Sequence, residues 1–183
     1  MLLSSIIPSL LLAASVISSP TQSGSSHTEL VASGKTEFEV AQKAVIQVQQ
    51  PVKTLCYQGQ PDEVKGKLES LYNPVYEVST KVHEIVQIKE KIVYSNVEAY
   101  FVAFVKLLVE FEVIIKTVGN YPKIVNYTKT HFTHFDTHFA KISKDLQDCG
   151  IDVSKRFREH VELNFTIWAT VGFTFQTKYL EGH

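Results

Sequence analysis

Apolar side chains recur every three or four residues from residue 36 almost to the C-terminus, which is the spacing of one face of an α-helix. The stretch 95–118 is the densest example and places Val97, Phe101 and Phe104 on one face. No segment alternates polar and apolar residues as a half-buried strand would. The sequence therefore predicts an all-α fold, an antiparallel bundle of five or six helices joined by short loops.

Capping motifs and prolines mark where these helices begin. Thr36 and Ser95 each precede a glutamate by three residues and form capping boxes, while Pro61 and Pro122 occupy the first-turn position that tolerates proline. The expected helices cover 36–50, 61–72, 75–94, 95–118, 122–148 and 152–180. The first helix runs further, to residue 56, if the chain bends through Pro51 instead of stopping there.

The helix 95–118 is apolar on about three sides, yet four charged residues interrupt it: Glu98, Lys106, Glu110 and Glu112. A charge at the centre of a membrane span costs about 2.5–3.5 kcal/mol on insertion scales. We therefore expect no integral membrane span and place this helix at the centre of the bundle.

The N-terminal residues 1–18 predict a secretory signal peptide. They contain no charged residue, and Val16 and Ser18 occupy the −3 and −1 positions of a cleavage site. No basic residue precedes the apolar run and Pro8 interrupts it, so an uncleaved anchor is the alternative. The run is shorter than the roughly 20 residues that a membrane span needs. We expect cleavage, and a secreted, extracellular protein.

Residues 19–34 are dominated by Ser, Thr, Gly and Pro, and predict a disordered leader. Residues 35–183 then form one helical-bundle domain, which is long enough to bury a core. The whole chain has 18 basic and 19 acidic residues, a formal charge of −1, and no concentrated basic patch. This composition argues against nucleic-acid binding.

The chain contains two cysteines, Cys56 and Cys149. An even number in a secreted protein favours a disulfide, and two free thiols are the alternative. The two can meet only if the chain crosses the bundle an even number of times between them. A reversal at Pro74 gives four crossings, whereas a kink at Pro74 gives three. A helix of 25 residues spans about 37 Å, far beyond the roughly 7 Å limit between bridged Cα atoms. The predicted disulfide therefore requires a reversal at Pro74, unless residues 51–60 run back along the bundle and change the count.

Three histidines and three phenylalanines alternate in residues 130–139, which read THFTHFDTHF. On a helix the phenylalanines form the core face, the histidines lie along its shoulder, and Asp136 points away from the histidines. His131 and His138 lie about 10.5 Å apart along the axis, too far for one ion to bind all three imidazoles.

The pair His134 and His138, four residues apart, remains the candidate metal site. Its third ligand would come from Asp145 or from His83 on another helix. The alternative is a helix flank that gains charge below about pH 6.5.

Two N-glycosylation sequons occur, Asn126-Tyr-Thr and Asn164-Phe-Thr. Asn126 lies near the start of a helix and is the stronger candidate. Asn164 lies at the edge of the apolar face of the last expected helix, where a glycan would compete with packing.

The sequence contains no catalytic motif such as G-x-S-x-G, and its carboxylates are spread along the helices. We therefore expect no catalytic residues, no enzyme activity and no cofactor. The eleven phenylalanines and eight tyrosines are expected to form the core. The alternative is that some of them line a cavity for an apolar ligand.

In general make-up the chain resembles the small secreted proteins of filamentous fungi and other host-associated microbes, a class without a shared motif. The leading hypothesis is a secreted, non-enzymatic, effector-like helical protein that binds another macromolecule, such as a host or cell-wall component. One alternative is a carrier of a lipid-like ligand in the bundle core. A second alternative is a protein that binds metal through His134 and His138.

Overall fold

The computed structural model of the chain describes residues 25–87, 94–159 and 163–180, and within these residues it is helical and contains no strand. This confirms the all-α prediction. The predicted signal peptide, residues 1–18, lies outside the described residues. The helices are α1 (Ser25–Gln58), α2 (Pro61–Glu69), α3 (Tyr72–Gln87), α4 (Tyr94–Gly119), α5 (Pro122–Asp148), α6 (Val153–Glu159), α7 (Phe165–Thr170) and α8 (Thr177–Leu180).

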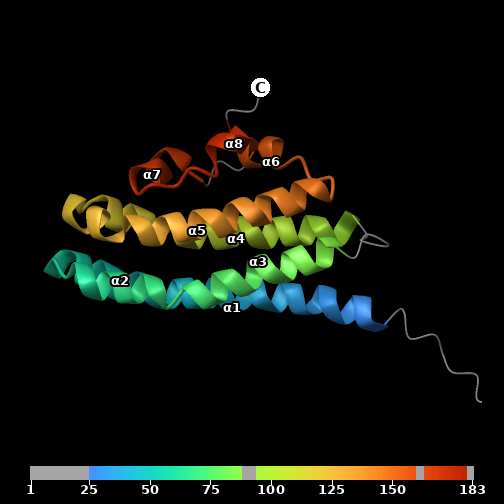
Figure 1. Cartoon of the computed structure of the whole chain (residues 1–183), viewed down its shortest axis with the longest axis horizontal. Helices are drawn as coiled ribbons and strands as arrows, with labels where there is room; N and C mark the ends of the chain where they lie inside the picture. Colours follow the sequence, from blue (N-terminus) through green and yellow to red (C-terminus); the bar gives the residue numbers. More distant parts are fainter. Residues whose placement is uncertain (1–24, 88–93, 160–162, 181–183) are drawn as a thin grey trace, which may run out of the picture.

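The long helices lie side by side, and the short helices α6, α7 and α8 form a layer over α5 (Figure 1). Helix α1 packs against α4, α3 and α2, while α5 packs against α3, α2 and α4. The apolar faces of α4 and α5 supply most of the buried aromatic residues. Among the described helices, none is both long enough and apolar enough to cross a membrane.

Helix α1 begins earlier than the sequence predicts, and its C-terminal end agrees with the alternative in which the helix continues past Pro51. It begins at Ser25, so residues 25–34 of the predicted disordered leader are helical, and it continues through Pro51 to Gln58. The side chain of Phe38 is buried against Tyr100 and Phe104 of α4. Gly34 and Phe38 bring this part of α1 against α3 and α4, and tertiary packing of this kind stabilises helices beyond what local propensity gives.

Pro74 lies in the first turn of α3 and marks neither a reversal nor a kink in one continuous helix. The chain breaks briefly at Ser70 and Leu71, because proline has no N–H to donate to the carbonyl four residues earlier and its ring crowds that carbonyl. Helices α2 and α3 both pack against α1 and α5, and they follow one another along the same side of the bundle (Figure 1).

The prediction of one continuous helix over residues 152–180 is wrong, because the structure has the three short helices α6, α7 and α8 there. Asp152 caps α6 as expected, accepting the N–H of Lys155 at 2.9 Å. Phe173 and Phe175 are both buried, although in a helix they would point about 200° apart. Gly172, with φ of 103°, ends the helical path and allows both rings to face the core.

Two carboxylates hold this C-terminal segment on the bundle. Asp136 of α5 accepts the N–H groups of Thr174 at 2.8 Å and Phe175 at 2.7 Å. The buried Glu112 of α4 accepts the indole N–H of Trp168 and the N–H of Asn164, both at 2.8 Å, and it pairs with Lys116 at 2.7 Å. These hydrogen bonds satisfy backbone groups that the broken helix leaves free.

The close approach of α1 to α3 and α4 at Gly34 gives a stability test. A Cβ at this position would lie 2.8 Å from Cδ1 of Ile85 and 3.0 Å from the ring of Tyr100. The cost of this overpacking opposes the gain of about 0.5–1 kcal/mol that alanine gives within a helix, and Cδ1 of Ile85 can shift in part. Gly34→Ala should therefore lower the free energy of unfolding by about 1 kcal/mol, measured by urea denaturation. Gly66→Ala is the control, because Gly66 is exposed within α2 and has open space around it. It should raise stability by about 0.5–1 kcal/mol. Equal effects of the two changes would contradict this packing.

Candidate functional site

The two cysteines are free thiols at opposite ends of the bundle, so the predicted disulfide is wrong. Cys56 borders the same pocket as Pro122 and Ile124, at the start of α5, whereas Cys149 directly follows the last residue of α5. A helix of this length, 27 residues, spans about 40 Å. Helices α2 and α3 continue in one direction past Pro74, so the reversal that the predicted disulfide requires does not occur there.

Neither thiol is set up as a nucleophile. Burial raises the pKa of the Cys56 thiol to about 11. Burial, with a smaller contribution from Asp145 and Asp148, also raises the pKa of Cys149. Both side chains are therefore protonated at neutral pH, and a protonated thiol is a poor nucleophile.

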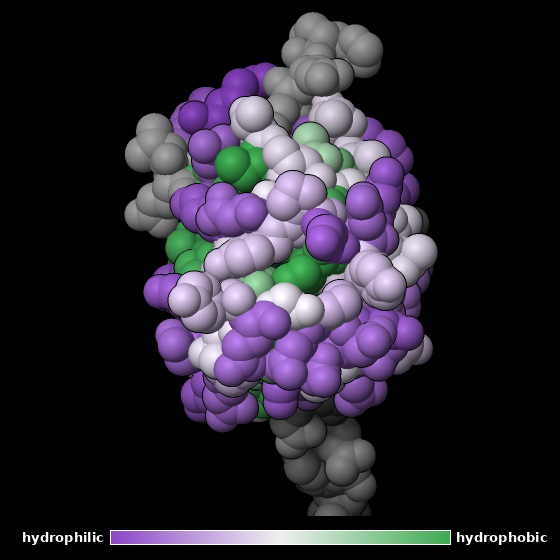
Figure 2. Space-filling view, turned by 90° about the vertical axis from the view of Figure 1, so that its left-hand side faces the viewer, coloured by the Kyte–Doolittle hydropathy of each residue, from purple (hydrophilic) through white to green (hydrophobic). Residues whose placement is uncertain are grey.

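An apolar pocket of about 630 Å³ lies where the end of α1, the start of α2 and the α4–α5 turn meet. Its lining includes Cys56, Pro61, Tyr121, Pro122, Ile124 and Tyr127. Figure 2 views this end of the bundle and shows hydrophobic residues near its middle, set among hydrophilic ones. Pockets of this size and character are typical binding sites.

Two exposed tyrosines stand at this end of the molecule. Tyr57, the neighbour of Cys56 in the chain, is 84% exposed, and Tyr127 on the pocket wall is 60% exposed. No motif in the sequence predicts this pocket, because its walls come from two turns that lie 62 residues apart, around Gly59 and around Tyr121. The sequence feature that the two turns share is a tyrosine within two residues of a glycine or a proline.

A second feature is a row of polar and aromatic contacts between α3 and α5, which we call the histidine seam. A hydrogen bond joins the Tyr72 hydroxyl to Nδ1 of His131, and seven residues further along both helices Ser79 Oγ lies 3.0 Å from Nδ1 of His138. The ring of Tyr72 also packs against His134, with 4.2 Å between centroids. The three histidines on the shoulder of α5 therefore face α3.

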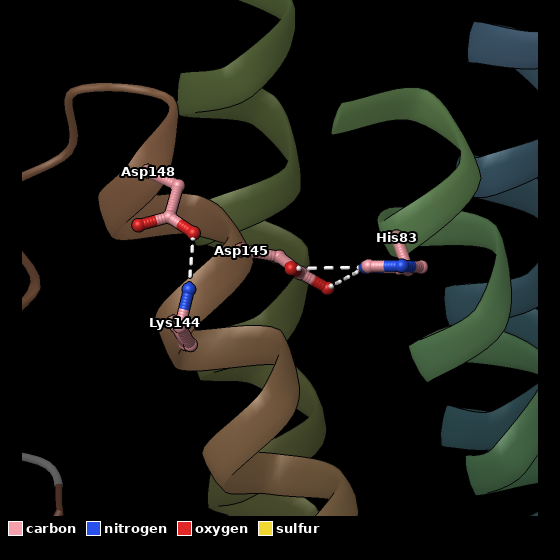
Figure 3. Close-up of polar contacts among 4 residues, drawn as sticks. All are labelled: His83, Lys144, Asp145 and Asp148. Atoms are coloured by element: carbon pink, nitrogen blue, oxygen red, sulfur yellow. Dashed lines mark hydrogen bonds and ion pairs between the residues drawn. The ribbon is translucent and has the colours of Figure 1, made fainter. Parts of the chain in front are cut away.

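The structure brings His134 and His138 together, with 3.4 Å between their Nε2 atoms. The expected third ligands do not join them, because His83 Nδ1 lies 3.1 and 3.2 Å from the carboxylate oxygens of Asp145 (Figure 3). Lys144 points away from this pair and contacts Asp148 instead. No group of three potential metal ligands occurs within the part of the chain that the structure describes.

Burial lowers the pKa of two seam histidines. For His131 the Glu69 carboxylate opposes this effect in part, while Lys65 and His134 add to it. For His138 the neighbouring charges of His134 and Lys141 lower the pKa further. Both imidazoles are therefore neutral at pH 7 in the folded protein.

Both sequon asparagines are exposed. Asn126 lies in the second turn of α5, and Asn164 immediately precedes α7. The expected position of Asn164, at the edge of the apolar face of one long helix, is wrong, because the residue precedes α7 and is exposed, while its N–H donates to Glu112. Glycosylation at either site stays a prediction.

Comparison of the chain with protein-family models, with curated proteins and with solved structures found no match. The fold itself assembles two candidate sites, the apolar end pocket and the histidine seam.

The lowered pKa values of His131 and His138 predict a loss of stability in acid. The unfolded chain takes up these protons at about pH 6.5, while the folded chain takes them up only at lower pH. The free energy of unfolding should therefore be highest above about pH 6.5 and fall as the pH drops below it. Urea denaturation between pH 5 and 7.5 measures this slope. Replacing both histidines by glutamine should reduce the slope, and an unchanged slope would contradict the assignment.

Proposed function

We propose that this chain is a secreted, non-enzymatic helical protein that binds another macromolecule, such as a host protein or a cell-wall component, through its apolar end pocket. The observation that carries the proposal is the open apolar pocket beside the exposed Tyr57 and Tyr127. Exposed apolar surface with a polar surround marks interaction sites, and tyrosines are enriched among the residues that dominate binding energy.

The proposal includes the secretion of the protein and an antiparallel arrangement of its helices. The uncharged apolar segment 1–18, with small residues at its end, supports export and an effector-like role outside the cell. The short connections at Gly59–Gln60 and Asn120–Tyr121 support an antiparallel order, because short loops join antiparallel neighbours. The exposed Asn126 and Asn164 side chains support glycosylation during export.

A second candidate function is the carriage of an apolar small molecule. The volume of the end pocket falls within the range of about 300–1,000 Å³ that is typical of small-molecule sites. The end pocket is not the bundle-core cavity that the sequence suggests as an alternative. In the core, the rings of Phe111, Phe135 and Phe139 pack against one another.

A photo-crosslinking amino acid at position 127 tests the proposed function directly. When the protein is recovered from the natural secretome, the photo-crosslinking group at position 127 should be joined to a macromolecule. The same group at position 76 should form no such crosslink. Tyr76 is the matched control, because it is a half-exposed tyrosine on α3 outside the pocket lining. Equal crosslinking from both positions, or none from position 127, would contradict the proposal.

Once the partner is identified, Tyr127→Ala should weaken its binding by roughly 10-fold or more, because tyrosines are common among the hot-spot residues that dominate binding energy. Tyr76→Ala should leave the binding unchanged. Asn120→Trp offers an independent test, since Asn120 is exposed at the pocket wall and a tryptophan there would cover the opening. Native mass spectrometry separates the two functions. A co-purified small molecule that Asn120→Trp removes would support the carrier function instead.

A further inference from the structure

The two Nε2 atoms of His134 and His138 are spaced as ligands of one tetrahedral metal ion would be. Their separation is 3.4 Å. Two zinc–nitrogen bonds of about 2.0–2.1 Å that meet at the tetrahedral angle place the nitrogens about 3.3–3.4 Å apart. The observed spacing therefore needs little rearrangement to accept an ion between the rings.

The hydrogen bonds around Ser79 favour one tautomer of His138. The Ser79 hydroxyl lies 2.9 Å from the carbonyl oxygen of Tyr76, to which it can donate its single hydrogen. Its oxygen, 3.0 Å from Nδ1 of His138, is then free to accept the Nδ1–H of that imidazole. This leaves the lone pair of His138 on Nε2, which is the atom that faces His134.

In the His134 tautomer that carries its proton on Nε2, this N–H can donate to Nε2 of His138. His134 is exposed, so its ring can exchange this proton with water and take the Nδ1–H tautomer, which leaves Nε2 free as a ligand. Each neutral imidazole then offers one lone pair, and the number of bound protons does not change. The buried Ser79 holds the orientation of His138, as hydrogen-bonding groups behind a ligand do in metal sites.

We propose that His134 and His138 form a surface site for a divalent transition-metal ion of the Zn²⁺ class, with the two Nε2 atoms as its protein ligands and water in the other positions. The exposure of His134 leaves room for that water. Imidazole ligands suit Zn²⁺, Cu²⁺ and Ni²⁺ and do not suit Ca²⁺ or Mg²⁺. The site is independent of the end pocket and of the function proposed for it.

Titration of the metal-free full-length protein with Zn²⁺ alone, followed by calorimetry and by ¹⁵N NMR of the imidazoles, tests the site. One ion should bind per chain, with the Nε2 signals of His134 and His138 changing together. Ser79→Ala should weaken binding by roughly 10–100-fold, as does the loss of a group that hydrogen-bonds to a metal ligand. His134→Ala should weaken it at least as much. Ca²⁺ should produce no such change.

His83→Asn is the matched control, because His83 lies on the same α3–α5 interface but binds Asp145. It should leave Zn²⁺ affinity unchanged. Because His134 is exposed, His134→Ala should keep the fold, and circular dichroism checks this. The test therefore does not depend on His138→Ala, which removes a more buried side chain and could unfold the protein. Zn²⁺ binding that survives His134→Ala at full affinity, or the absence of binding at millimolar Zn²⁺ in the folded parent, would overturn the site.

Discussion

The burial of the phenylalanine face of α5 is the constraint on which the rest of the structure depends. The ring of Phe139 lies 5.3 Å from Phe111 of α4 and 5.9 Å from Phe173 in the C-terminal segment. Aromatic pairs at such distances add about 0.5–1.5 kcal/mol each beyond the burial of their area. Because this packing fixes the rotation of α5 about its axis, it also turns the neighbouring histidines toward α3.

The C-terminal segment covers this aromatic face, and its irregular path follows from that role. A single straight helix would direct Phe173 and Phe175 to different sides, so the chain gives up helical hydrogen bonds there. Asp136 and the buried Glu112 replace them with hydrogen bonds to backbone N–H groups. A carboxylate that accepts several such bonds is well stabilised even where little water reaches it.

The end pocket and the histidine seam place different chemistry on the same helix. The pocket uses the first turns of α5, where Ile124 and Tyr127 meet the end of α1, and it offers apolar and aromatic surface. The seam begins one turn further along and offers imidazoles held by groups of α3. An apolar partner and a metal ion would therefore bind close together without sharing a side chain.

The sequence by itself determined the all-α class, the helices that became α2 to α5, the core face of α5 and the closeness of His134 and His138. These depend on contacts within three or four residues, which the spacing of side chains along one helix dictates. Only the tertiary structure decided that Cys56 and Cys149 stay apart, that the last rod breaks at Gly172, that α1 extends back to Ser25, and that a pocket opens beside Tyr127. Each of these depends on which distant segments pack together, and no local pattern in one chain encodes that choice.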